Sequence, residues 1–186
     1  MIVTAKDIPG KNFISMIEND WPVLVEEKIN HYGEAVALIA HPNKWMLEKA
    51  RKHIKVVCEA LTPVLTLDES IAKKEVIWGQ DNVLKHYHLR KGNITQSWAE
   101  ADFIIENTYE TGAQEQLYIE NNGMIAQYSE TDGITVWGSL QCPYYIHEAL
   151  MPVFQLPEDK VRVIQVETGG GFGGKEDFPS LLASHA

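Results

Sequence analysis

The stretch that decides the fold lies at the C-terminal end, where residues 161–186 read VRVIQVETGGGFGGKEDFPSLLASHA. Its β-branched start predicts a strand, and five of the six residues from Gly169 to Gly174 are glycines. Glycine loses more conformational entropy on folding than any other residue, so this density indicates positive φ or a close approach to another group. DFPSLLASHA then predicts the start of a helix. A glycine-rich turn between a strand and a helix is a common cradle for a phosphorylated ligand.

Two phosphate-binding patterns match the loop only in part. Residues 169–175 satisfy the G-x-x-x-x-G-K pattern of a P-loop, but Glu176 follows where Ser or Thr must hold Mg²⁺. The same glycines satisfy G-x-G-x-x-G, but the dinucleotide fingerprint needs an acidic residue about 20 positions further on, and the chain ends first. A plain glycine-rich surface loop would leave the bulky Phe172 in its middle unexplained.

Composition and charge exclude several classes of partner. The chain has 186 residues and is 45% hydrophobic, which is enough to bury a core for one domain or two small ones. Its formal net charge of −10 argues against nucleic acid and against an anionic membrane surface. The apolar stretches are too short to span a bilayer, and residues 1–11 lack the features of a signal peptide. A cytoplasmic protein is therefore predicted.

Cysteine and histidine residues do not predict a metal centre. The two cysteines, Cys58 and Cys142, can build neither a disulfide framework nor an iron–sulfur cluster within the chain. We expect Cys58 to be a small buried hydrophobe and Cys142 to pack, with an approach to a cofactor as the alternative. His86 and His88 would share one face of an extended chain, but without a third ligand exposed histidines of a connector are favoured.

The first part of the chain predicts a small α+β unit. WPVLVEE (21–27) and EAVALIAH (34–41) are strand-like and are joined across the turn signal NHYG. Asn43 is the predicted N-cap of a helix with one apolar face. IKVVCEAL (54–61) predicts a further strand that ends before Pro63.

A polar stretch with little periodicity, from about Ser70 to Asn107, predicts a connector. Beyond it, Asp132-Gly133 marks a tight hairpin, and YYIHEALMPVFQL (144–156) predicts a short helix that ends near Pro152. The strands predicted around these features lie within FIIENTYETG (103–112), GMIAQYSETDGITVWGSL (123–140) and KVRVIQVETGGG (160–171).

GGGFGGKE (169–176) resembles the glycine loop of the molybdenum hydroxylases, the xanthine dehydrogenase and aldehyde oxidase family, where it lies against the molybdopterin cofactor. VTAKDIPGKN and YGEAVALIAH resemble that family's hammerhead domain, and GAQEQLYIENNGMIA and GSLQCPYYIHEAL resemble the opening of its molybdenum domain. The resemblance implies an α+β fold. It places an N-terminally truncated α/β hammerhead-like domain at 1–75, a connector at 76–107, and the start of a C-terminally truncated molybdopterin-binding domain at 108–186.

The resemblance also implies roles for individual residues. Gln141 corresponds to the glutamine that hydrogen-bonds an oxygen ligand of molybdenum. Glu176 corresponds to the acid that binds the heterocycle in purine-hydroxylating members and that aldehyde oxidases commonly lack, which favours a purine or similar N-heterocycle as substrate. A helix acid favoured by the helix dipole is the structural alternative for Glu176. The loop backbone that binds the cofactor corresponds to Gly171, Phe172, Gly173 and Gly174.

Members of this family hydroxylate an electron-poor carbon with oxygen from water, and electrons leave through iron–sulfur clusters and FAD. FAD and [2Fe–2S] clusters would lie on partner chains here, and the pterin could be a cytosine dinucleotide. The family's catalytic glutamate lies in the C-terminal part of the molybdenum subunit, beyond this chain, and Gln116 stands where many members have histidine.

The resemblance thus implies a component of a xanthine dehydrogenase-like hydroxylase that is inactive alone and is completed by the rest of the molybdenum subunit in a complex. A non-catalytic structural or binding fragment without cofactor is the alternative.

Overall fold

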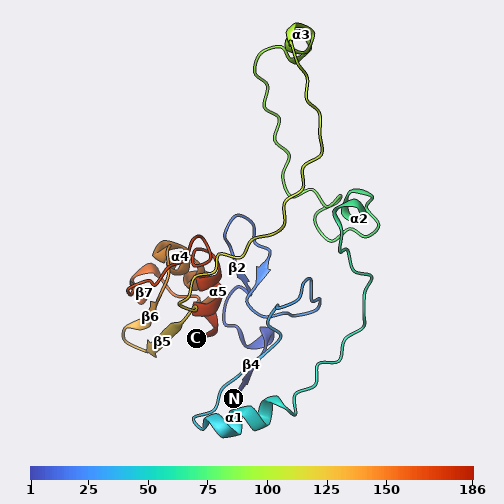
Figure 1. Cartoon of the computed structure of the whole chain (residues 1–186). Helices are drawn as coiled ribbons and strands as arrows, with labels where there is room; N and C mark the ends of the chain where they lie inside the picture. Colours follow the sequence, from blue (N-terminus) through green and yellow to red (C-terminus); the bar gives the residue numbers. More distant parts are fainter. The chain divides into compact units, whose positions relative to one another are not determined.

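The computed structural model describes the whole chain, residues 1–186, which divides into two compact units (Figure 1). Unit 1 joins Met1–Lys55 to Gln114–Ala186, and unit 2 consists of Val56–Ala113. Helices and strands are mixed along the chain, so the predicted α+β class is confirmed. No helix combines the length and the apolar character needed to cross a membrane. The domain division at 75 and 107 stays a prediction.

A three-stranded sheet forms the centre of the C-terminal part of unit 1. The strands are β5 (Met124–Ser129), β6 (Gly133–Gly138) and β7 (Val161–Gln165), in the order β5-β6-β7. β5 and β6 form the predicted hairpin, in which Ser129 pairs with Gly133 at φ +77°. β6 and β7 are parallel, so the chain must cross from one end of the sheet to the other between them.

Helix α4 (Pro143–Phe154) makes this crossing, and 3₁₀-helix η2 (Glu158–Lys160) leads into β7. α4 begins with proline at its first turn, where the missing N–H group costs no hydrogen bond. The helix, predicted to end near Pro152, continues two residues further to Phe154, and its C-cap Gln155 has the left-handed conformation.

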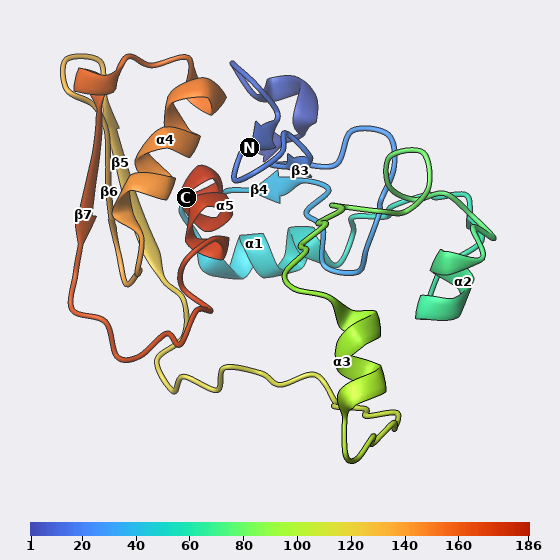
Figure 2. The ribbon, with the colours of Figure 1, turned by 90° about the horizontal axis from the view of Figure 1, so that it is seen from above.

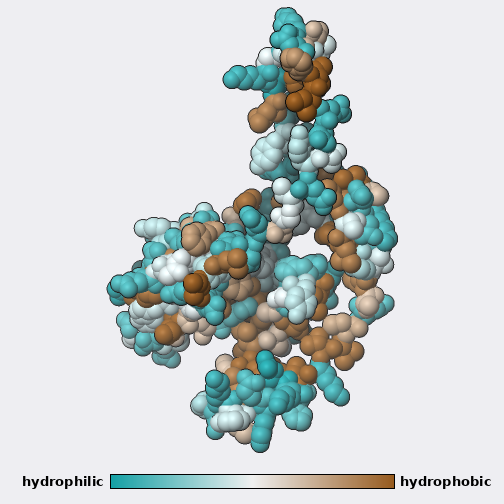
Figure 3. All heavy atoms as spheres, viewed as in Figure 1, coloured by the Kyte–Doolittle hydropathy of each residue, from teal (hydrophilic) through white to brown (hydrophobic).

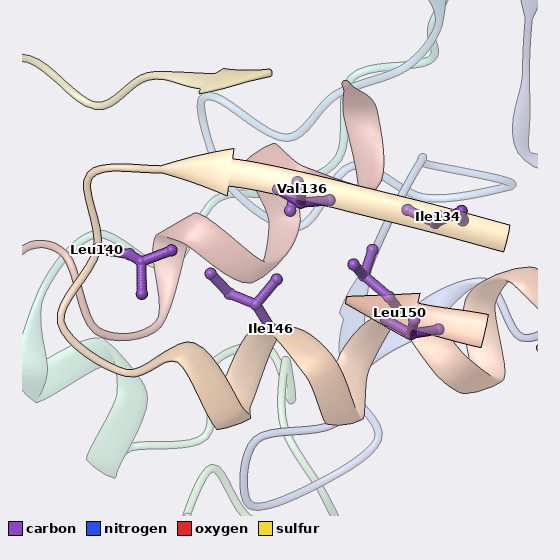
Figure 4. Close-up of a cluster of buried hydrophobic side chains, with 7 residues drawn as sticks. Ile134, Val136, Leu140, Ile146 and Leu150 are labelled. Carbon is purple, nitrogen blue, oxygen red and sulfur yellow. The ribbon is translucent and has the colours of Figure 1, made fainter. Parts of the chain in front are cut away.

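One face of α4 packs on the sheet. Ile146 and Leu150 point from the helix toward Ile134 and Val136 of β6, and Leu140 closes the end of this cluster (Figure 4). All five side chains are buried. Burying an aliphatic side chain of this size contributes about 1.5–3 kcal/mol, so this cluster fixes α4 on the sheet.

The adjacent part of the same buried face of α4 packs on the N-terminal part of the chain. Ala149 and Val153 share a second buried cluster with Ile14 and Leu24, and also with Leu181 of α5. Helix α5 (Phe178–His185), predicted from the sequence, lies with α4 on one side of the sheet (Figure 2). A Cβ at Gly10 would lie 2.1 Å from the carbonyl oxygen of Pro152, so the N-terminal chain approaches α4 at its backbone.

Short strand pairs order the N-terminal part of unit 1. β1 (Ile2–Val3) pairs with β4 (Leu38–Ile39), and β2 (Phe13–Ile14) pairs with β3 (Trp21–Pro22). The strands predicted at 21–27 and 34–41 are thus much shorter and pair with other partners. The hydrogen bond from Val25 N–H to Ala35 O, 2.7 Å, links the two stretches.

Two further elements lie in this part. 3₁₀-helix η1 (Ala5–Asp7) follows β1, and α1 (Lys44–Arg51) begins at the predicted N-cap, Asn43. The Asn43 side chain accepts hydrogen bonds from the N–H groups of Trp45 and Met46 at 2.9 and 3.3 Å. No residue of α1 is buried, so capping rather than packing defines this helix.

Unit 2 contains two short helices, α2 (Leu67–Ile71) and α3 (Ile94–Glu100), and the chain runs out to α3 and back in extended segments (Figure 1). The strands predicted at 54–61 and 103–112 are wrong, because neither stretch pairs with another strand. Cys58, predicted to be buried, is exposed, since no apolar layer covers its segment. Apolar surface gathers around α3 (Figure 3).

His86 and His88 are exposed, as expected for connector histidines. No group of three His, Cys, Asp or Glu side chains is close enough together to hold a metal ion.

We expect Leu150→Ala to lower the free energy of unfolding by about 2–5 kcal/mol, because it leaves a cavity between α4 and the sheet. Tyr144, on the same helix, is 78% exposed. Tyr144→Ala should change the same free energy by less than about 0.5 kcal/mol. Urea unfolding of the three proteins measures both changes, and equal losses in the two variants would contradict the packing described here.

Candidate functional site

The glycine loop between β7 and α5 has an unusual backbone. Gly170, Phe172 and Gly173 have φ values of +96°, +51° and +92°. Phe172 is therefore a non-glycine residue in the left-handed region, which costs on the order of 1 kcal/mol or more. Its side chain is 76% exposed and contributes nothing to the core. The core packing therefore does not account for this backbone conformation.

Gln141 holds the loop from the side. Its backbone N–H donates to Lys175 O at 2.8 Å. Its side-chain Oε1 accepts from the N–H groups of Gly173 and Lys175 at 3.0 and 3.3 Å. Because both partners are donors, the oxygen must face the loop, and the Nε2 group is left with no acceptor in the chain. A Cβ at Gly171 would lie 2.3 Å from Oε1, so any larger residue there would have to displace the Gln141 side chain.

Lys175 is fully buried and ion-paired. Its Nζ lies 2.6 Å from Glu120 Oε2 and 3.0 Å from Ser139 Oγ, and its side chain is 0% exposed. The same ammonium lies 4.9 Å from the centroid of the Tyr118 ring, a cation–π distance. The lysine of a P-loop would reach outward to phosphates, whereas this one turns inward.

One oxygen atom, Glu120 Oε2, accepts three hydrogen bonds. Besides Lys175, Glu120 Oε2 accepts from Ser139 Oγ at 2.5 Å and from Gly169 N–H at 2.8 Å. Lys175, Ser139 and the Gly169 N–H together lower the pKa of Glu120 to about 2. Glu120 is therefore ionised at neutral pH. We call Glu120, Ser139 and Lys175 the carboxylate cluster.

The segment before β5 covers the loop. A Cβ at Gly174 would lie 2.4 Å from Tyr118 Cε1 and 3.3 Å from Gln116 Cδ. Asn122 Nδ2 donates to the Tyr118 hydroxyl at 2.7 Å, which fixes the ring. Gln116 thus packs against the loop.

Glu176 follows Lys175, whose carbonyl oxygen accepts the hydrogen bond from the Gln141 backbone N–H group. The Glu176 side chain is half-buried and makes no hydrogen bond. α5 begins at Phe178, so Glu176 precedes the first helical turn and is not one of its residues. Burial and then the negative charges of Glu176 and Asp177 raise the pKa of the Cys142 thiol. Cys142 is therefore a neutral, half-buried neighbour of Glu176.

The structure thus brings all the candidate residues to one place. It adds three that sequence reasoning did not single out, Glu120, Ser139 and Tyr118. The only hint of these residues in the sequence was Lys175 directly after the glycines, and the sequence does not show which carboxylate a lysine binds.

Several hydrogen-bond donors at the loop have no acceptor in the chain. The N–H groups of Gly170, Gly171 and Phe172 donate to no acceptor in the chain, and neither does Gln141 Nε2. Backbone N–H groups in such a turn form concavities that bind anionic or polar oxygens. The bare backbone also lets a flat or bulky group approach closely.

A family model described as "Molybdopterin cofactor-binding domain" matches residues 78–186. The nicotinate dehydrogenase large molybdopterin subunit of Eubacterium barkeri is 33% identical over 172 residues, which are 92% of this chain and 40% of that protein. The xanthine dehydrogenase molybdenum-binding subunit of Escherichia coli O157:H7 is 29% identical over 156 residues, covering 83% of this chain and 21% of that protein. The chain thus spans less than half the length of these relatives.

Solved structures show the same fold. The aldehyde oxidoreductase from Desulfovibrio gigas superposes with a TM-score of 0.83 and 22% identity, covering 100% of this chain and 22% of that chain. Quinoline 2-oxidoreductase from Pseudomonas putida 86 gives a TM-score of 0.75 and 20% identity, covering 98% of this chain and 25% of that chain.

Gly171→Ala should displace the Gln141 amide, because its Cβ would overlap Oε1. We expect faster hydrogen exchange at the Gly173 and Lys175 amides, by at least about tenfold, since each would lose its acceptor. Gly123→Ala is the control, because a Cβ there meets nothing within 4 Å. Exchange measured by NMR or mass spectrometry decides, and unchanged loop protection in Gly171→Ala would contradict the contact.

The carboxylate cluster predicts an acid-sensitive contribution to stability. The folded pKa of Glu120 is about 2 against an ordinary 4.5, so the stabilisation is fully present above the ordinary value and disappears as pH falls through 2. The difference in unfolding free energy between the wild type and Glu120→Gln should be constant above about pH 5.5 and shrink below it. Urea titrations from pH 7 to pH 3 test this, and a pH-independent difference would refute it.

Proposed function

The chain belongs to the molybdopterin cofactor-binding domain family of the xanthine dehydrogenase and aldehyde oxidase enzymes, and we propose that it forms one wall of their molybdenum site. In this proposal the glycine loop and Gln141 bind the cofactor, and Glu176 binds the substrate. The assembled enzyme oxidises a carbon of a purine or similar N-heterocycle.

The observation that carries the proposal is the fixed amide of Gln141. Its oxygen is held by two backbone N–H groups of the loop, so Nε2 must point away from them and can donate to an oxygen of the cofactor. An amide donor binds such an oxygen without adding a charge, which suits a group whose own charge changes during the reaction.

The loop backbone would lie against the cofactor from Gly171 to Gly174. The unpaired N–H groups of Gly171 and Phe172 are the donors available to it, and the exposed Phe172 ring supplies an apolar contact beside them. When bound, the molybdenum cofactor supplies the oxidising centre that takes electrons from the substrate carbon.

Glu176 is the residue of this chain that would hold the substrate. Its half-buried carboxylate has no partner in the chain, so it can accept from a ring N–H group and stabilise charge that shifts onto the ring. The neighbouring Cys142 thiol stays protonated because its pKa is raised, and therefore does not compete as a nucleophile or anion. A relative whose name specifies nicotinate is consistent with a nitrogen heterocycle.

The rest of the molybdenum subunit and subunits with FAD and [2Fe–2S] clusters would complete a cytoplasmic complex. Relatives are designated a large molybdopterin subunit and a molybdenum-binding subunit, which supports assembly from several chains. The product oxygen would come from water, which ¹⁸O-labelled water tests, and the pterin could be a cytosine dinucleotide. A cofactor-free structural fragment is the alternative, and molybdenum that copurifies with the assembled protein separates the two.

We expect Glu176→Ala in the assembled enzyme to lower kcat/KM for xanthine at least ~10-fold, about 1.4 kcal/mol, with molybdenum content unchanged. An aldehyde offers no ring nitrogen, so its kcat/KM should fall much less. Glu176→Gln, which keeps the shape but not the charge, shows whether the charge is needed. Equal losses for xanthine and the aldehyde would remove Glu176 from the substrate site.

Gln141→Ala should impair both substrates alike, because its proposed partner is the cofactor and not the substrate. Steady-state kinetics with xanthine and an aldehyde, with the molybdenum and pterin content assayed in parallel, measure this. Wild-type content and wild-type rates in Gln141→Ala would refute the proposed cofactor contact.

A further inference from the structure

The two ends of the glycine loop are tied to one atom. Glu120 Oε2 accepts from the Gly169 N–H group at the start of the loop and from Lys175 Nζ at its end, at 2.8 and 2.6 Å. The carboxylate thereby closes the loop from 169 to 175. Ser139, directly after β6, donates to the same oxygen and ties it to the sheet.

Lys175 also links this closure to Gln141. Its carbonyl accepts from the Gln141 backbone N–H, and its own N–H donates to Gln141 Oε1. One residue thus binds Glu120 with its side chain and Gln141 with both main-chain groups.

Stability alone is a weak reason for this ion pair. Lys175 is 0% exposed, and removing an ammonium from water carries a large free-energy cost that a salt bridge only partly offsets. The Glu120 side chain is 42% exposed, so water screens its attraction to the ammonium and the pair offsets less of that cost. What an apolar pair could not supply is a directional acceptor for the Gly169 N–H group and a fixed distance between the loop ends.

We propose that Glu120 and Lys175 are positioning residues that set the orientation of the Gln141 amide by closing the glycine loop. The inference rests on the proposed function, because orientation matters only if Gln141 and the loop face the cofactor. Neither side chain contacts cofactor or substrate in this proposal. Their effect passes through the main chain of Lys175.

The first experiment uses the 186-residue chain without cofactor and the variants Lys175→Met, Glu120→Gln and the double variant. Glu120→Gln leaves the buried Lys175 ammonium without its counter-charge, whereas Lys175→Met leaves only the 42%-exposed Glu120 unpaired. Glu120→Gln should therefore lower stability more, and the double variant should regain most of that loss. Exchange at the Gly173 and Lys175 amides should nevertheless stay at least about tenfold faster than in the wild type in the double variant. A merely stabilising pair predicts the opposite, with loop exchange recovering along with stability.

A second lysine–glutamate pair supplies the control. Lys74 Nζ lies 2.9 Å from Glu69 Oε1 in unit 2, with both side chains partly exposed. Lys74→Met and Glu69→Gln should leave exchange at Gly173 and Lys175 at the wild-type rate. Faster loop exchange in these variants would show a global effect and overturn the proposal.

The second experiment uses the assembled enzyme with the double variant Lys175→Met and Glu120→Gln. We expect kcat to fall at least about tenfold for both xanthine and an aldehyde, with KM and molybdenum content near the wild-type values. A higher KM with an unchanged kcat would contradict a positioning role. If Gln141→Ala has no effect on content or turnover, the proposed function fails, whereas the loop exchange in the cofactor-free chain is judged independently.

Discussion

Burial of one face of helix α4, against both the sheet and the N-terminal segment, is the constraint on which the rest of unit 1 depends. Ile146 and Leu150 hold the helix on β6, and Ala149 and Val153 hold the N-terminal segment on the helix. Because α4 connects two parallel strands, its packing places the start of the helix and the end of β7 at the same edge of the sheet. Gln141 precedes the helix and the glycine loop follows β7, so the core itself brings these two parts of the site together.

Sequence patterns correctly predicted the elements that are stabilised by neighbouring residues in the chain. The hairpin at Asp132-Gly133 follows from turn chemistry, and Asn43 caps α1 with its own side chain. Apolar stretches at 54–61 and 103–112 were wrongly predicted as strands, because a strand exists only with a partner, which a single stretch of sequence does not reveal. Cys58 was misplaced for the same reason.

The residues of the candidate site also fall into those that the sequence could predict and those that it could not. Gln141, the loop and Glu176 could be named because their motifs resemble those of a known family. Glu120 and Ser139 could not, since they lie 55 and 36 positions from Lys175 and no spacing rule joins them. Lys175 matches a sequence motif without having that motif's function. Its place after the glycines satisfies a phosphate-binding motif, but its ammonium is buried against a carboxylate and cannot reach a phosphate.

The long separation between Glu120 and Lys175 also has a consequence for biosynthesis. Contacts between residues far apart in sequence form late, because the intervening chain must first be ordered. During translation Glu120 and Ser139 leave the ribosome well before Lys175, and the hairpin and α4 can fold in that interval. The loop can close only after the whole of β7 and the glycines have emerged. In the proposed function, a cofactor held by this loop would therefore be loaded after synthesis of the unit, onto a folded chain.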